Sequence, residues 1–344
     1  MPTTGGRSPV MSDVAKVAGV SHQTVSRVVN GHPNVREETV VRVRRAIAEL
    51  GYQPNSTARA LVTRRTNVLG ALAVDTTLFG PAQTLAGIER AAREAGYFLS
   101  IVSVDDLSPD GVAEALDHLV QQAVEGCVAI TPQRELAHAL AALPGPRPLV
   151  AVEGGEGAGF PVVGVDQEQG ARDAVRHLVG LGHRTVHHVA GRADWLEAEA
   201  RVHGWREELL AAGHVVPEPL AGDWSPRSGY ELGHRLAERR AAGEEVTAVF
   251  VANDQMAVGV LKAFHEVGLR VPDDVSVVGF DDIPESAYLT PGLTTVVQDF
   301  TRVGTAALEV LLGALESPDH ADTPVDRTVP AVLRVRDSSA PPSA

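Results

Sequence analysis

The sequence predicts an α/β protein with a small three-helix unit at its N-terminus, followed by two lobes of doubly wound parallel sheet. Three observations lead to this prediction. The length of 344 residues exceeds that of one typical domain. Residues 11–50 carry apolar side chains at helical spacing. From residue 68 onward, short β-branched runs alternate with amphipathic segments, as they do when helices connect parallel strands.

The charges divide the chain into two parts. The net charge is −14, but residues 1–66 hold ten basic and four acidic side chains and therefore carry +6. The remaining 278 residues carry −20. Because a basic segment attracts phosphates and an acidic one repels them, nucleic acid is expected to bind at the N-terminal unit.

The composition indicates a globular chain. Hydrophobic residues make up 44% of it, and no apolar run approaches the roughly 20 residues of a membrane span. The first ten residues are polar and lack the apolar stretch of a signal peptide, so we expect a cytoplasmic protein with no membrane partner. The single cysteine, Cys127, lies in an apolar run and is expected to be buried rather than to form a disulfide or a zinc site.

Two short helices joined by a glycine-containing turn are predicted within residues 11–30. Ser12 is expected to cap the first helix and Gly19 to end it, and Ser21 is expected to cap the second. This spacing is typical of a helix-turn-helix, and a third helix over about 36–50 would close its core.

The second of these helices has one apolar face. Val25, Val28 and Val29 stand at positions i, i+3 and i+4, which lie on one side of a helix, and must face inward. The side chains left on the outside are polar and suit base edges and phosphates: His22, Gln23, Ser26, Arg27 and Asn30.

Three motifs follow one another in fixed order within residues 13–55. They are Asp-Val-Ala-x-x-Ala-Gly-Val-Ser, Thr-Val-Ser-Arg-Val-Val-Asn and Gly-Tyr-x-Pro-Asn. Together they resemble the DNA-binding headpiece of the LacI/GalR family of transcriptional regulators. The resemblance implies a homodimer that binds palindromic double-stranded operator DNA. It also implies DNA contacts from Ser21, His22, Gln23, Thr24, Ser26, Arg27 and Asn30.

The segment 55–66 resembles the hinge helix of the same family, which enters the minor groove. The resemblance implies that Leu61 wedges a base step open, with Thr57 and Ala58 on the side that faces the groove. Such a wedge unstacks one step and bends the duplex. The alternative is an ordinary linker whose Leu61 packs on the body.

Residues 67–336 are expected to form the body, which resembles a periplasmic-binding-protein-like core that binds an effector and dimerises. Its N-lobe is predicted to span about 67–166 and 297–330, and its C-lobe about 167–296. The other predicted parts are a disordered N-terminus (1–10), the helix-turn-helix domain (11–54), the hinge helix and linker (55–66) and a disordered tail (337–344). The tail has no leucine heptads, so a dimer is expected rather than a tetramer.

Several polar residues follow predicted strands of the body, where parallel sheets bind ligands. A sugar site needs planar hydrogen-bonding partners for neighbouring hydroxyls and an aromatic face for its C–H surface. Asn253, Asp281, Arg201 and Trp224 supply those groups. With the resemblance, the expected ligand site consists of Leu78, Phe79, Glu153, Trp195, Arg201, Trp224, Asn253, Asp281, Gln298 and Phe300.

The resemblance implies a repressor released by a small sugar effector, a galactoside or galactose. Another saccharide or a nucleoside remains an alternative, and Arg201 has the alternative of a salt bridge between the lobes. A solute-binding protein with no DNA role would need a signal peptide and no basic headpiece, contrary to this sequence.

Enzymatic activity and cofactors are not expected. The sequence contains neither a phosphate-cradling Gly-x-x-x-x-Gly-Lys-Ser/Thr loop nor a Gly-x-Ser-x-Gly nucleophile turn. His183, His187 and His188 fall in a predicted loop and strand, where their spacing does not suit a shared metal ion, so no metal is expected.

Overall fold

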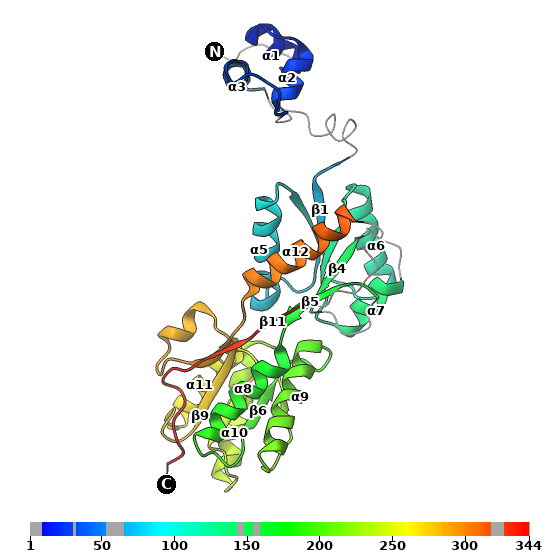
Figure 1. Cartoon of the computed structure of the whole chain (residues 1–344). Coiled ribbons are helices and arrows are strands. Elements are labelled where there is room, and N and C mark those ends of the chain that lie inside the picture. Colours follow the sequence, from blue (N-terminus) through cyan, green and yellow to red (C-terminus); the bar gives the residue numbers. More distant parts are fainter. Residues whose placement is uncertain are drawn as a thin grey trace, which may run out of the picture. The chain divides into compact units, whose positions relative to one another are not determined.

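The computed structural model describes residues 9–29, 32–52, 65–142, 148–153, 159–317 and 327–343. The chain separates into two compact units, Met1–Thr66 and Asn67–Ala344 (Figure 1). Residues 1–8 of the expected disordered N-terminus (1–10) and residues 55–64 of the expected hinge helix and linker (55–66) lie outside the described residues.

The N-terminal unit consists of α1 (Met11–Ala18), α2 (His22–Val29) and α3 (Glu37–Leu50) around a small apolar core. Ser21 caps α2 as predicted, since its Oγ accepts a hydrogen bond from the Thr24 amide at 3.1 Å. The predicted cap at Ser12 is wrong. Helix α1 begins at Met11, and the Asp13 carboxylate instead accepts from the Val10 amide at 2.9 Å.

The first sheet of the second unit forms the N-lobe. In the described part of the chain it has six parallel strands in the order β11-β5-β4-β3-β1-β2. The strands are β1 (Val68–Ala73), β2 (Phe98–Ser103), β3 (Cys127–Ile130), β4 (Leu149–Val152), β5 (Val162–Val165) and β11 (Arg327–Val329). The sheet lies between two pairs of helices: α5 (Phe79–Glu94) with α12 (Phe300–Glu316), and α6 (Pro109–Gln121) with α7 (Arg134–Ala142) (Figure 1).

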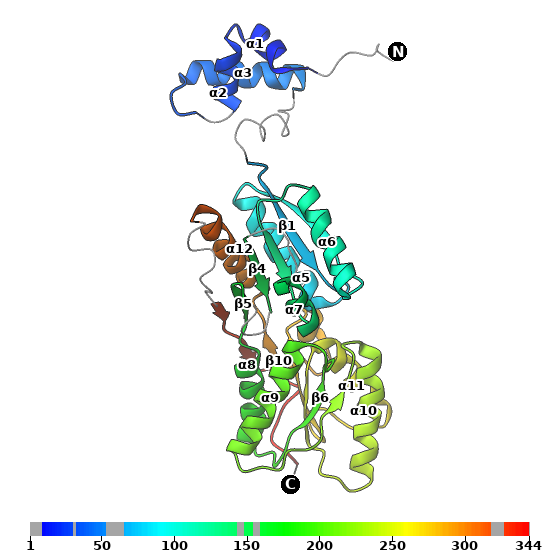
Figure 2. The same cartoon turned by 90° about the vertical axis from the view of Figure 1, so that its right-hand side faces the viewer.

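The second sheet forms the C-lobe, in the order β12-β10-β9-β8-β6-β7 over the described residues, with only β12 antiparallel to its neighbour. Its strands are β6 (His187–Ala190), β7 (Leu220–Ala221), β8 (Ala248–Val251), β9 (Ser276–Asp281), β10 (Thr294–Val297) and β12 (Val332–Arg334). Its helices are α8 (Gln167–Gly180), α9 (Leu196–Ala211), α10 (Pro226–Ala241), α11 (Asp254–Glu266) and the short η1 (Pro284–Tyr288) (Figure 2).

Local sequence explains where the helices of both lobes begin. Five of the described helices in the two lobes start directly after a residue whose side-chain oxygen accepts a hydrogen bond from an amide of the first turn, which satisfies an otherwise unpaired donor. The capping residues are Ser108, Asp166, Ser225, Asn253 and Asp299. Asp166, Asn253 and Asp299 also follow β5, β8 and β10 closely, so three of these helix starts lie at carboxyl ends of strands.

The C-terminal segment differs from the expectation of a disordered tail. Ser338 is fully buried, and its hydroxyl donates to the carbonyl of Val277 at 2.6 Å and accepts from the Thr294 amide at 2.8 Å. Ala340 accepts a hydrogen bond at 3.0 Å from the buried Ser276 hydroxyl. The polar composition suggested disorder, but the serines pair with polar groups of β9 and β10.

The three histidines that raised the question of a metal are buried in the C-lobe. His183 bonds to Thr247 and Ser276, and His188 stacks on Phe250 at 4.7 Å between ring centroids. No cluster of potential metal ligands occurs among the described residues.

Within the same residues, no helix has the length and apolar character needed to cross a membrane. Cys127 is fully buried, as predicted.

Close packing of α10 against α11 depends on glycine. A Cβ atom at Gly229 would lie 2.1 Å from the backbone oxygen of Met256. We therefore expect Gly229→Ala to lower the free energy of unfolding by about 2 kcal/mol through overpacking, measured by thermal or urea denaturation. Gly313→Ala in α12, where no atom lies within 4 Å of the added Cβ, is the matched control and should not destabilise the chain. Equal losses of unfolding free energy in the two variants would show that the packing of α10 against α11 does not require glycine at position 229.

Candidate functional site

Helix α2 presents a row of polar side chains. His22, Gln23 and Arg27 are exposed, whereas Val25 and Val28 are buried in the core of the N-terminal unit. Ser21 and Thr24 are joined through their hydroxyl oxygens at 2.9 Å, and Ser26 is half-buried on the same helix. The remaining residues of the expected DNA contact set lie outside the described residues: Asn30, Thr57, Ala58 and Leu61.

In the second unit, a buried arginine lies where the two lobes meet. Arg201 of α9 is 2% exposed. Its Nε donates to Oε1 of Gln167 at 2.9 Å, and its Nη1 donates to the carbonyl of Ala252 at 2.5 Å. The guanidinium lies 3.9 Å from the ring centroid of Phe280, and Nη2 is 4.0 Å from Asp281. A buried cation requires such compensation.

Gln167 links this arginine to both lobes. Its Nε2 donates to Oε1 of Gln298 at 2.9 Å and lies 3.4 Å from Oε2 of Glu153. Gln298 in turn donates from Nε2 to Oδ1 of Asp281 at 2.6 Å. One hydrogen-bonded network therefore runs from Glu153, directly after β4 in the N-lobe, to Asp281, at the end of β9 in the C-lobe.

Aromatic rings surround the network. Trp195 and Trp224 lie 5.5 Å apart between ring centroids, and Phe79 meets Phe300 edge to face at 5.9 Å. The tryptophans are 2% and 4% exposed, and neither indole N–H has a hydrogen-bond partner among the described residues. A buried donor without a partner costs about 1–3 kcal/mol, so these two N–H groups are ready for an acceptor.

Two adjoining spaces lie at this place. The inner cavity has a volume of about 30 Å³ and is lined by Leu78, Phe79, Gly80, Pro81, Trp195, Glu197, Arg201, Trp224, Asn253, Gln255, Asp281, Gln298 and Phe300. The outer chamber is larger, about 650 Å³, and shares Glu197 with the inner cavity.

The structure thus brings nine of the ten expected ligand residues to the inner cavity, and the tenth, Glu153, lines the outer chamber. The lining residues that were missed include Gln167 of the outer chamber and Gln255 of the inner cavity. Gln167 carried a usable signal, because it begins a helix immediately after the chain crosses from the N-lobe to the C-lobe.

Asn253 has a structural task besides any ligand contact. Its Oδ1 caps α11 by accepting from the Met256 amide at 2.9 Å, and its Nδ2 donates to the carbonyl of Trp224 at 3.1 Å. The second hydrogen on Nδ2 is left for a ligand. The neighbouring Asp254 is committed to the fold, since it accepts from Ser286 and Thr295, both at 2.6 Å.

Backbone strain is concentrated at the site. Glu153, Trp224 and Asp281 have φ angles of 60°, 74° and 113°, in a region that side chains rarely adopt. Strained conformations cost about 1–3 kcal/mol each and persist where the surroundings hold them, often at binding sites. Gly191 makes room for one of them, because a Cβ there would lie 2.0 Å from the Trp224 ring.

Burial also changes the acidity of the site. Loss of hydration raises the pKa of Asp281 to about 8 and that of Glu153 to about 8, while the charge of Arg201 acts against both shifts. Burial raises the pKa of Glu197 as well. Near neutral pH Asp281 and Glu153 are therefore mostly protonated, whereas carboxyl groups in water are ionised.

These carboxyl groups make stability depend on pH. Their pKa values are near 8 in the folded chain and about 4 in the unfolded chain, so between these values the folded chain binds more protons. The resulting stabilisation is complete below about pH 4 and is lost as the pH rises through about 8. We expect the unfolding free energy to fall over this range and Asp281→Asn to flatten the profile, as measured by thermal unfolding at a series of pH values.

Glu231→Gln, at an exposed carboxylate of α10, serves as the control for Asp281→Asn and should leave the profile unchanged. An unaltered profile in the Asp281→Asn variant would show that this carboxyl does not hold a proton in the folded state.

Comparisons with known proteins agree with both parts of the chain. Residues 10–55 match the family model described as bacterial regulatory proteins, lacI family, and residues 175–339 match a periplasmic binding protein-like domain. The lactose operon repressor of Escherichia coli (strain K12) is 35% identical over 302 residues, which cover 87% of this chain and 83% of that protein.

Solved structures give the same result. The lac repressor dimer bound to operator and the anti-inducer ONPF is 32% identical, with a TM-score of 0.85 over 97% of this chain and 100% of that chain. The complex of the transcriptional regulator CelR with cellobiose is 30% identical, with a TM-score of 0.71 over 96% of this chain and 100% of that one. The chain therefore belongs to the lacI family of bacterial regulatory proteins and is a DNA-binding transcriptional repressor of that family.

Proposed function

We propose that this repressor acts as a homodimer on a palindromic operator and is released from DNA by a small saccharide, a galactoside or galactose, bound at the inner cavity. The observation that carries the proposal is the buried Arg201 network, beside which two indole N–H groups have no hydrogen-bond partner in the part of the chain that the structure describes. Together they offer planar charged partners, free donors and aromatic faces, which a sugar ring requires.

Two observations support the DNA part of the proposal. The N-terminal unit carries the basic charge of the chain, and α2 exposes His22, Gln23 and Arg27 while burying its valines. A palindromic site calls for a symmetric dimer. The similar lac repressor structure is a dimer bound to operator.

The galactoside assignment rests on the similarity to the lactose operon repressor. The inner cavity also favours a second candidate, another saccharide, because Trp195 and Glu197 take up space in its wall. A similar regulator has been solved with cellobiose. Both candidates use the same Arg201 network.

A saccharide must move the lobes or their side chains, because a cavity of about 30 Å³ has room for little more than a water molecule. Contacts between the lobes hold it in this state. Arg134 of α7 pairs with Glu199 of α9 at 2.5 Å, and the Leu196 amide donates to the carbonyl of Pro132 at 2.8 Å. A ligand that separates these contacts changes the relation of the lobes and thereby biases the DNA-binding state.

Gln23→Ala tests the DNA part. Losing a side chain that faces base edges should weaken binding to the cognate operator by about 1–3 kcal/mol and leave binding to unrelated duplex nearly unchanged. Fluorescence anisotropy at fixed salt measures both, after operator selection from a random palindromic library. Gln121→Ala, exposed at the end of α6, is the control. Failure of the unaltered chain to bind any palindrome would refute the repressor assignment.

Arg201→Lys tests the effector part. Lysine keeps the charge but not the planar fork that holds Gln167 and the ligand, so we expect operator binding to persist and release by saccharide to be lost. Operator affinity is measured with and without galactose and lactose. Arg206→Lys, exposed on the same helix, should behave as the unaltered chain. A full saccharide response in the Arg201→Lys variant would remove Arg201 from the site.

A further inference from the structure

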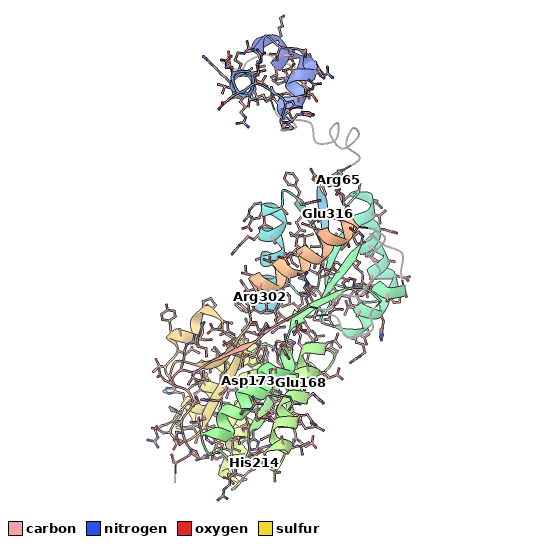
Figure 3. The ribbon with its side chains drawn as sticks, viewed as in Figure 1. Arg65, Glu168, Asp173, His214, Arg302 and Glu316 are labelled. Atoms are coloured by element: carbon pink, nitrogen blue, oxygen red, sulfur yellow. The ribbon has the colours of Figure 1, made fainter. Side chains whose placement is uncertain are left out.

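The outer chamber is a second space beside the inner cavity and shares Glu197 with it. Its volume of about 650 Å³ is in the range of ligand pockets, whereas the inner cavity has a volume of only about 30 Å³. The N-lobe contributes Glu153 and Arg327 to its wall, and α9 of the C-lobe contributes Glu197, Ala200 and His203. Figure 3 labels Glu168, another of its wall residues, at the start of α8.

The basic side chains of the chamber wall already have acidic partners. Arg134 contacts Glu199 at 2.5 Å, His203 contacts Glu168 at 3.0 Å, and Arg327 contacts Glu309 at 2.6 Å. A ligand that carries an anionic group would have to break one of these pairs, so the wall does not favour one.

Glu153 has hydrogen-bonding positions to spare. Glu153 accepts from the Val165 amide at 2.9 Å and lies 3.4 Å from Gln167, and a protonated carboxyl group offers one O–H donor and further acceptor positions besides these. Neither Glu153 nor Glu197 is within ion-pairing distance of a cation in the described part of the chain. Because Glu197 lines both spaces, its carboxyl group stands at the junction between the inner cavity and the outer chamber, and Glu153 lines the chamber alone.

We infer that the effector has two sugar units, one ring in the inner cavity and a second, hydroxyl-bearing unit in the outer chamber whose hydroxyls hydrogen-bond to the carboxyl groups of Glu153 and Glu197. This inference rests on the proposed saccharide effector. A monosaccharide would leave these carboxyl groups to water. An apolar group in place of the second unit would bury the carboxyl groups of Glu153 and Glu197 without new hydrogen-bond partners.

Isothermal titration of the full chain with galactose, glucose, lactose, melibiose and cellobiose tests the inference. At least one disaccharide should bind about tenfold or more tightly than each of its own monosaccharides, a gain of about 1.4 kcal/mol from a few added hydrogen bonds. Ala200→Leu fills the chamber from α9 without touching the inner cavity. It should remove most of this gain and leave monosaccharide binding unchanged.

Ala211→Leu, exposed at the end of the same helix, is the matched control and should bind all five sugars as the unaltered chain does. The inference is overturned if the disaccharides bind no more tightly than their monosaccharides, or if Ala200→Leu weakens both classes equally. If none of the five sugars binds the unaltered chain, the proposed saccharide effector fails together with the two-unit inference. Unfolding midpoints of both variants confirm that they are folded.

Discussion

The burial of Arg201 is the constraint on which the site depends. A guanidinium that is 2% exposed must have its donors paired and its charge balanced, and residues from several elements supply both. Gln167 and the carbonyl of Ala252 accept its hydrogen bonds, Phe280 lies against its plane, and Asp281 stands 4.0 Å away. Through Gln167 and Gln298 the same network reaches both lobes. A molecule that contacts Arg201 therefore contacts a network whose hydrogen bonds depend on how the two lobes are arranged.

The fold makes this arrangement available because both sheets end their parallel strands at the boundary between the lobes. Glu153 follows β4, Asn253 follows β8 and Asp281 ends β9. Positive φ angles at Glu153 and Asp281 indicate a backbone held in place by its surroundings rather than by local preference. Arg302, labelled in Figure 3, lies near the start of α12, where the chain has crossed back from β10 to the N-lobe.

Periodicity in the sequence was sufficient for the fold class and for the apolar face of α2, because Val25 and Val28 needed only helical spacing. The inner cavity required the family resemblance, since its residues are far apart in the chain and no local pattern links Phe79 to Phe300. Gln167 was missed because many helices begin with a glutamine, and only its place at the crossing between the lobes distinguishes it. The segment around Ser338 was misread because polar composition does not reveal pairing with a sheet.

The central claim is that DNA and saccharide compete through one conformational equilibrium of this chain. The most direct measurement is the affinity of the saccharide for the free protein and for the operator-bound protein under the same salt conditions. Linkage requires the operator to weaken saccharide binding by the same factor by which the saccharide weakens operator binding. Equal saccharide affinity in the two states would contradict the account, because a ligand that does not distinguish two states cannot shift their equilibrium.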